Sequence, residues 1–248
     1  MPEAAPKIRL FVADDLHADG RVVVDRAQAH YLGHVMRCRP GDGIALFNGR
    51  DGEWQARIEA FGKAQAELSV SNQLRPQTAE PGPWLVFAPI KREGLALMVE
   101  KATELGVALL QPVITRRTVV GRLNLERLRR IAVEAAEQCG RLTLPELCEP
   151  SPLAKLAEGW PAGRALIFAD EGGAPRLNYV AGTAPGALAL LVGPEGGFEA
   201  EERAFLRGLD FVRPASLGPR ILRAETAAIA GLAVLQALTV ADASPPRL

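Results

Sequence analysis

Two glycine-containing segments in the C-terminal half hold the residues best suited to chemistry. The first runs from Leu190 to Phe198 and reads LLVGPEGGF, and the second runs from Leu217 to Ala227 and reads LGPRILRAETA. In each, an apolar run leads through a glycine turn into a helical pattern, which places main-chain N–H groups where a small polar ligand can be held. We therefore expect the two turns to meet at one sheet edge and form a pocket.

Charged side chains within these turns indicate a ligand contact. Glycines alone would be explained by a tight connection that uses positive φ. Glu195, however, lies among them between a buried strand and a helix, where packing gives no reason for a carboxylate. Arg220 and Arg223 precede a buried helix, and each could face a ligand or pair with Glu225 or another carboxylate.

Several other kinds of site are not supported. The chain has no G-x-x-x-x-G-K-S/T, no G-x-G-x-x-G after a strand and no G-x-S-x-G elbow, which argues against a P-loop, the usual dinucleotide fingerprint and a hydrolytic triad. His30 and His34 have zinc-ligand spacing without a metalloprotease glutamate between them, which favours surface or substrate-facing histidines. Cys38, Cys139 and Cys148 form no C-x-x-C pair, so we expect no metal and no disulfide framework, and a reducing cytoplasm.

The composition is that of a globular chain without net charge. With 248 residues, 48% of them hydrophobic, the chain can form one large domain or two modest ones, and 29 basic residues balance 29 acidic ones. This balance argues against indiscriminate nucleic-acid binding, although seven arginines between Thr115 and Arg141 could form a local basic face or a solvated helix face with Arg–Glu pairs. The longest apolar stretch, Ala227 to Leu238, is too short to cross a bilayer, and we see no secretion signal.

The N-terminal part predicts a small β-barrel. Short β patterns and two Asp-Gly turns fill the range from Ile8 to Asn72. One helix is expected to interrupt them, beginning near Asp25 with Gln28 as a capping-box partner and ending at about Arg37. The expected strands are Val22–Val24, Gly43–Asn48, Glu53–Ala60 and Ala66–Ser71.

The remainder predicts an α/β domain with a largely parallel sheet covered by helices on both faces. A proline-rich connector at residues 75–83 separates residues 1–74 from this domain, residues 84–248. One helix is expected to end at Gly106, and another to begin after Asn124 and end at Gly140. The last helix, from Ala224 to Leu238, is apolar almost all round, which requires burial by its own core or by a second subunit; we favour a dimer contact. The expected strands are Trp84–Ile90, Ala108–Ile114, Ala165–Ala169, Ala187–Val192 and Phe211–Leu217.

Several stretches of this sequence resemble those of the SPOUT-class RNA methyltransferases, and within that class those of the 16S ribosomal RNA (uracil-N3) methyltransferase family. The resemblance covers nearly the whole chain, and its two glycine-containing segments form a specific signal in this order and spacing. The resemblance implies a PUA-like RNA-binding barrel in residues 1–74, a trefoil-knotted SPOUT domain in residues 84–248, and a homodimer whose active site draws on both subunits. The matching stretches are HYLGHVMR at 30–37, KATELGV at 101–107, EAAEQCGR at 134–141, GPEGG at 193–197 and ILRAETA at 221–227.

The resemblance also implies a cofactor and roles for individual residues. S-adenosyl-L-methionine would be bound in a bent form without a metal. From the chemistry of methyl transfer to N3, we expect Arg223 to stabilise the uracil anion and Glu195 or a water molecule to take the N3 proton; the alternative is that both residues only hold the loops in shape. One departure is Glu199, where the family often has a serine or threonine that caps the following helix. The residues implied for the cofactor are Gly193, Glu195, Gly196, Gly197, Leu217, Gly218, Ile221 and Leu222, and those expected to contact RNA are Arg9, Arg116, Gln138 and Arg141.

Two alternative functions remain open at this point. One is a non-catalytic RNA-binding or ribosome-assembly protein with the same two-domain architecture. The other is a SPOUT methyltransferase that acts on another RNA or on a ribose hydroxyl, although the N-terminal barrel argues against ribose methylation. Free 16S ribosomal RNA and the assembled small subunit are both possible substrates.

Overall fold

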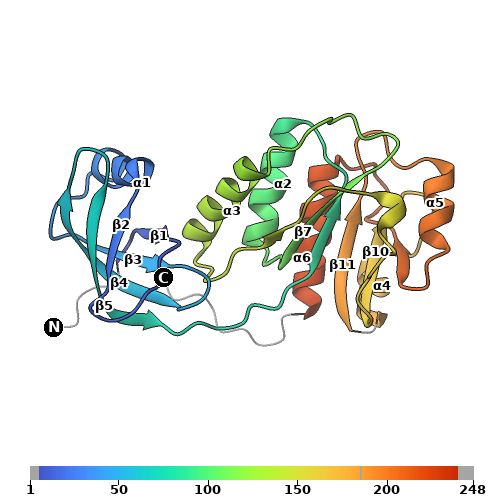
Figure 1. The fold of residues 1–248 in the computed structure, drawn as a ribbon. Coiled ribbons are helices and arrows are strands. Elements are labelled where there is room, and N and C mark those ends of the chain that lie inside the picture. Colours follow the sequence, from blue (N-terminus) through green and yellow to red (C-terminus); the bar gives the residue numbers. More distant parts are fainter. Residues whose placement is uncertain (1–5, 185, 240–248) are drawn as a thin grey trace. The chain divides into compact units, whose positions relative to one another are not determined.

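The chain forms two compact units (Figure 1), and the computed structural model describes residues 6–184 and 186–239. The first unit comprises the residues up to Ala79 together with Ala136–Thr143. The second comprises Glu80–Ala135 and the residues from Leu144 onward. The first unit is therefore assembled from two separate stretches of the sequence.

The first unit contains a five-stranded sheet with the order β1-β3-β4-β5-β2. β1 pairs with β3 in parallel, and the other pairs are antiparallel. All five strands contribute to one apolar core, including Leu10, Val22, Ile44, Ile58 and Leu68, so the sheet encloses its core as a barrel does. The strands are β1 (Arg9–Phe11), β2 (Arg21–Val24), β3 (Gly43–Phe47), β4 (Glu53–Phe61) and β5 (Ala66–Arg75).

The helix that interrupts these strands begins where the sequence pattern predicts and ends as a π-helical turn near the predicted end. α1 spans Arg26–His30 and continues as a π-helical turn, Tyr31–Val35. Asp25 caps α1 as expected, because its carboxylate accepts the Gln28 N–H at 2.9 Å. The predicted capping box is wrong, since the Gln28 amide donates to the carbonyl oxygen of Phe11 at 2.8 Å. A tertiary partner has replaced the local one.

A buried ionic cluster joins the two stretches of the first unit. The carboxylate of Glu53, which is 8% exposed, bonds Arg9 at 2.5 Å and Arg75 at 2.7 Å. Arg9 also donates to the carbonyl oxygens of residues 136, 137 and 141, and Arg75 to that of Gly140. These carbonyls lie at the C-terminal end of α3 (Leu125–Cys139) and just beyond it, where cations are favourable.

We expect Glu53→Gln to lower the unfolding free energy by about 3 kcal/mol at neutral pH, because it breaks a buried ion pair. Burial alone would raise the pKa of Glu53, but its hydrogen bonds with Arg75 and Arg9 outweigh burial and hold the pKa below its ordinary 4.5. The stability that the charged group contributes is therefore complete above pH 4.5 and lost as the pH falls through the lowered value.

Thermal melting from about pH 5 to about pH 3 measures this loss. The melting temperature of the wild-type protein should fall more steeply than that of Glu53→Gln. If the melting temperatures of the wild-type protein and of Glu53→Gln fell with pH at the same rate, the charge of Glu53 would have no stabilising role. Glu59→Gln, at an exposed position of the same strand, is the control.

The second unit contains a seven-stranded sheet in which all pairs are parallel. Its main order is β12-β10-β11-β6-β7-β8, and β9 also pairs with β7. β6 ends at Phe87, earlier than expected, because Pro89 has no N–H to donate to a ladder. The strands are β6 (Trp84–Phe87), β7 (Leu109–Ile114), β8 (Glu146–Leu147), β9 (Ser151–Pro152), β10 (Arg164–Ala169), β11 (Ala187–Val192) and β12 (Val212–Ala215).

Alternating strand residues form separate cores on the two faces of this sheet. Leu190 and Val192 belong to one core, with α2 (Arg92–Glu104), α3, α4 (Leu177–Thr183) and α6 (Ala224–Thr239). Leu191 belongs to the other, with α5 (Ala200–Arg207) and the 3-10 helix at Leu153–Lys155. Figure 1 shows α6 and α5 on opposite sides of β10 and β11. The expected layer of helices on both faces is confirmed.

The local helix signals are also reflected in the structure. The Asn124 side chain accepts the Arg127 N–H at 2.9 Å and caps α3, which ends at Cys139 before Gly140. α5 begins after Glu199 without a serine or threonine cap, because the Glu202 carboxylate accepts the Glu199 N–H at 2.9 Å. Within the described residues, no helix is both long and apolar enough to span a membrane.

Candidate functional site

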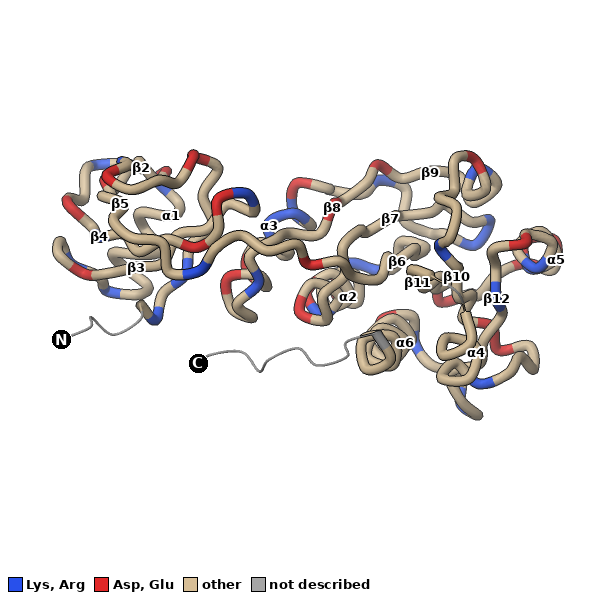
Figure 2. The backbone as a smooth tube through the Cα atoms, turned by 90° about the horizontal axis from the view of Figure 1, so that it is seen from below, with Lys and Arg blue, Asp and Glu red and all other residues tan. Residues whose placement is uncertain are grey.

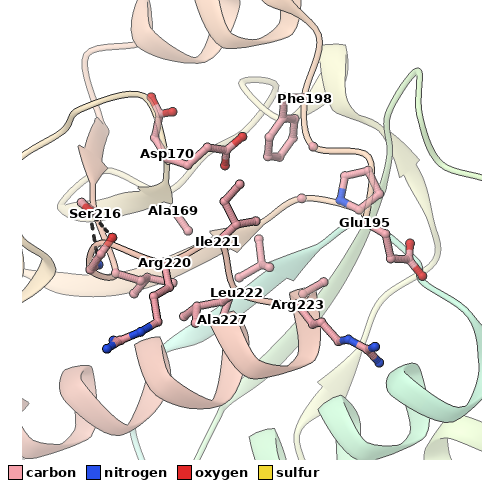
Figure 3. Close-up of a pocket in the computed structure, with 18 residues that line it drawn as sticks. Ala169, Asp170, Glu195, Phe198, Ser216, Arg220, Ile221, Leu222, Arg223 and Ala227 are labelled. Carbon is pink, nitrogen blue, oxygen red and sulfur yellow. Dashed lines mark hydrogen bonds between the residues drawn. The ribbon is translucent and has the colours of Figure 1, made fainter.

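Three loops meet where β10, β11 and β12 end. These strands are neighbours and run in parallel, so their carboxyl ends lie at one edge of the sheet, the usual place for a ligand in such folds. The loops begin at Asp170, Gly193 and Ser216, and together with the start of α6 they line a cavity of about 260 Å³ (Figure 3). The sequence pattern predicted the second and third loops.

Close main-chain approaches shape the loop after β11. A Cβ atom on Gly193 would lie 2.6 Å from the buried Phe198 ring, so only glycine fits there. Gly197 has a φ of +68°, and its N–H donates to the carbonyl oxygen of Pro194 at 2.8 Å. The exposed Glu195 carboxylate accepts the Lys91 N–H, at the start of α2, at 3.2 Å. This contact supplies a local reason for a carboxylate at that position.

Arg117 holds the same loop from outside the cavity. Its Nη1 donates to the Gly196 carbonyl oxygen at 2.7 Å, and its aliphatic carbons lie over the Gly196 Cα. Gly196 is the one cofactor residue expected from the sequence that does not line the cavity. The others do line it: Gly193, Glu195, Gly197, Leu217, Gly218, Ile221 and Leu222.

The loop after β12 contributes an apolar surface and two arginines. The Ser216 hydroxyl accepts the Gly218 N–H at 3.2 Å, and Ile221, 89% exposed, lies centrally in the view of the pocket (Figure 3). Arg223 and Glu195 extend at one side of the pocket, and Arg220 at the opposite side. Both arginines line the cavity, and no ion pair of either with Glu225 is seen within residues 6–184 and 186–239; a contact with a ligand stays a prediction.

The loop after β10 was missed by the sequence reasoning. Asp170 directly follows the strand, and its side chain is fully buried. It bonds Arg203 and Arg207 of α5, each at 2.6 Å, and accepts the Gly172 N–H at 2.9 Å. The available signal was the sequence Asp170-Glu171-Gly172-Gly173 at the carboxyl end of an apolar strand, which resembles the other two loops in composition.

The four residues expected to contact RNA have different surroundings. Gln138 is exposed on α3, whereas Arg141 is 8% exposed and Arg9 is enclosed by the acceptors described above. Arg116 bonds Glu199, just before α5, and Glu201 in its first turn, and both carboxylates raise the pKa of the Arg116 guanidinium above its ordinary value. RNA contact by all four residues stays a prediction. Figure 2 shows acidic and basic positions interspersed along both units.

No metal centre is found among the described residues. They contain no group of three or more histidine, cysteine, aspartate and glutamate side chains placed to hold an ion. The exposed rings of His30 and His34 stack on each other with their centroids 4.5 Å apart.

We expect Gly193→Ala to destabilise the protein by about 1–3 kcal/mol, because the added methyl group must displace the buried Phe198 ring. Gly196→Ala is the matched control, since its Cβ would lie 3.4 Å from the flexible Arg117 side chain. Chemical denaturation measures both variants. Equal stability of the two would contradict the close packing at Gly193.

Comparisons with known proteins match a family domain in each part of the chain. Residues 80–236 match the family model for the RNA methyltransferase domain, and residues 24–71 match that for the RNA methyltransferase PUA domain. The chain is 31% identical to ribosomal RNA small subunit methyltransferase E of Rickettsia conorii, over 93% of this chain and 95% of that one. It is 36% identical to the protein of that name from Synechocystis, over 93% and 77% of the two chains.

A solved structure extends this likeness to three dimensions. Ribosomal RNA small subunit methyltransferase E of Neisseria gonorrhoeae, crystallised with S-adenosyl methionine, is 29% identical. The comparison has a TM-score of 0.82 and covers 94% of this chain and 98% of that one. With its glycine-lined pocket, its parallel sheet and its N-terminal PUA domain, the chain belongs to the ribosomal RNA small subunit methyltransferase E family of RNA methyltransferases.

Proposed function

We propose that this protein methylates N3 of one uridine in 16S ribosomal RNA, with S-adenosyl-L-methionine as the methyl donor. The observation that carries the proposal is the cavity formed by three loops, which is lined by almost every residue that the family resemblance implies for the cofactor. The names of the matched relatives support a ribosomal RNA substrate. The relative from Neisseria gonorrhoeae supports the choice of cofactor.

The cavity has the chemistry that this cofactor requires. Val192, Leu217 and Leu222 offer apolar surface for an adenine ring, and the main chain of the glycine loops offers donors and acceptors for the polar groups. Asp170 and Glu171 are paired with arginines of α5, which leaves Glu195 as the wall carboxylate available to a cationic group of the ligand. Gly193, Glu195, Gly196, Gly197, Leu217, Gly218, Ile221 and Leu222 are the residues proposed to bind it.

The chain's own residues must turn uracil into a nucleophile. The cofactor supplies an activated methyl group, and transfer in line needs no metal, so the protein has to align the base and remove its N3 proton. Arg223 is proposed to stabilise the negative charge that develops on the uracil carbonyl oxygens. Glu195, on the same side of the pocket, is proposed to accept the proton.

The proposal extends to the domains and to the assembly. Residues 1–74 would bind RNA, residues 75–83 would form the linker, and residues 84–248 would be a SPOUT domain with a trefoil knot. Arg9, Arg116, Gln138 and Arg141 are the proposed RNA contacts. We also propose a homodimer located in the cytoplasm. Leu238, 48% exposed near the C-terminal end of the apolar helix α6, offers apolar surface to a second subunit. Sedimentation equilibrium measures the mass of the assembly.

Methylation of small-subunit RNA tests the proposed function directly. RNA from a strain that lacks the protein should contain less 3-methyluridine than RNA from its parent, and purified protein with the cofactor should restore it. Free 16S RNA and assembled 30S subunits are supplied in separate reactions to identify the substrate. Unchanged 3-methyluridine in the deletion strain would contradict the proposal. A different missing methylated nucleoside would favour another RNA target.

We expect Arg223→Ala to lower the single-turnover methylation rate by about 100-fold, the scale of a lost donor to a developing oxyanion. Affinity for S-adenosyl-L-methionine, measured by isothermal titration without RNA, should change far less. Arg220→Ala, on the opposite side of the pocket, is the comparison variant. An unchanged single-turnover rate in Arg223→Ala would remove Arg223 from the chemistry.

A further inference from the structure

One guanidinium contacts two of the three loops that form the pocket. Arg203 is the fourth residue of α5, and its side chain is 24% exposed. Its Nη1 donates to Asp170 Oδ1 at 2.6 Å, and its Nη2 bonds the carboxylate of Glu171. Its Nε donates to the carbonyl oxygen of Phe198 at 3.3 Å. Asp170 and Glu171 lie in the loop after β10, Phe198 lies in the loop after β11, and all three line the cavity.

The glycines of both loops leave room for this contact. A Cβ atom on Gly197 would lie 3.4 Å from Glu171 Oε1 and 3.7 Å from Arg203 Nη2. A Cβ atom on Gly172 would lie 3.0 Å from Asp170 Oδ1. The ion pair between Arg203 and Glu171 therefore lies against the main chain of the second loop, and the position of each loop depends on the other.

Arg207 provides an internal comparison. Its Nε and Nη2 both bond Asp170 Oδ2, at 3.2 and 2.6 Å, and these side-chain bonds reach only the first loop. Removal of either arginine leaves Asp170 with one guanidinium and the Gly172 N–H. The electrostatic loss at the buried carboxylate is thus similar, whereas only Arg203 joins the two loops.

We propose that Arg203 is a positioning residue that fixes the loops after β10 and β11 in the geometry that binds the methyl donor. This inference rests on the proposed function, because it assigns the pocket to that cofactor. A planar guanidinium can bond three acceptors in three directions at once, and a lysine cannot reproduce that arrangement. Arg203 acts through the loops and is not assigned a contact with the reacting atoms.

The test compares Arg203→Met with Arg207→Met in the full-length protein. Isothermal titration with S-adenosyl-L-methionine, without RNA, should show at least about tenfold weaker binding for Arg203→Met and less than about threefold for Arg207→Met. Arg203→Lys should recover thermal stability without recovering affinity. Equal affinity losses in the two methionine variants, or none in Arg203→Met, would overturn the proposal.

Hydrogen exchange of the ligand-free proteins separates this inference from the proposed function. Amides of residues 193–198 should exchange faster in Arg203→Met than in wild type or in Arg207→Met. If the wild-type protein does not bind the cofactor, the proposed function fails, and the exchange result still decides whether Arg203 joins the loops. If Arg203→Met does not fold, Glu171→Gln replaces it, because Glu171 is 55% exposed and its loss leaves Asp170 fully paired. Unchanged exchange in that variant would then count against the proposal.

Discussion

The fully buried carboxylate of Asp170 is the constraint on which the pocket depends. A charge without access to water has to be paired and hydrogen-bonded, or it costs several kcal/mol. Arg203, Arg207 and the Gly172 N–H meet that requirement, and to do so α5 has to pack beside the end of β10. Because α5 follows directly from the loop after β11, its placement also fixes where that loop can run. The cavity is a result of this pairing.

The parallel sheet supplies the rest of the geometry. β12, β10 and β11 are adjacent, so three loops that lie far apart in sequence begin within a few strand widths of each other. Glycine at Gly193 and Gly197 allows the main chain to approach Phe198 and Glu171 closely. Arg117 holds the outer surface of one loop through the Gly196 carbonyl oxygen. The loops are thus supported on both sides by side chains from other elements.

The sequence predicted those features that depend on local pattern. Five strands of the second unit, the Asn124 cap and the two glycine turns all follow from residues close together in the chain, whereas the short strands β8 and β9 and the helix α4 were not predicted. The features that it missed depend on distant partners. Gln28 bonds the carbonyl oxygen of a residue 17 positions away, and Arg203 bonds Asp170 across 33 positions. The periodicity of apolar residues does not indicate which of many arginines will neutralise which aspartate, so the sequence pattern did not predict a role for Asp170.

The noncontiguous make-up of the first unit has a consequence for how the protein is made. Arg9, Glu53 and Arg75 emerge from the ribosome well before residues 136–143, whose carbonyl oxygens they bond. At ordinary rates of translation the delay is on the order of several seconds, during which the N-terminal strands lack part of their final surroundings. A fragment that ends at Ala79 would keep the charged side chains of Arg9 and Arg75 but lack the carbonyl oxygens of residues 136–143 that they bond. The N-terminal unit is therefore a poor candidate for transplantation as a free-standing module, and synthesis must pass well into the second unit before the first is complete.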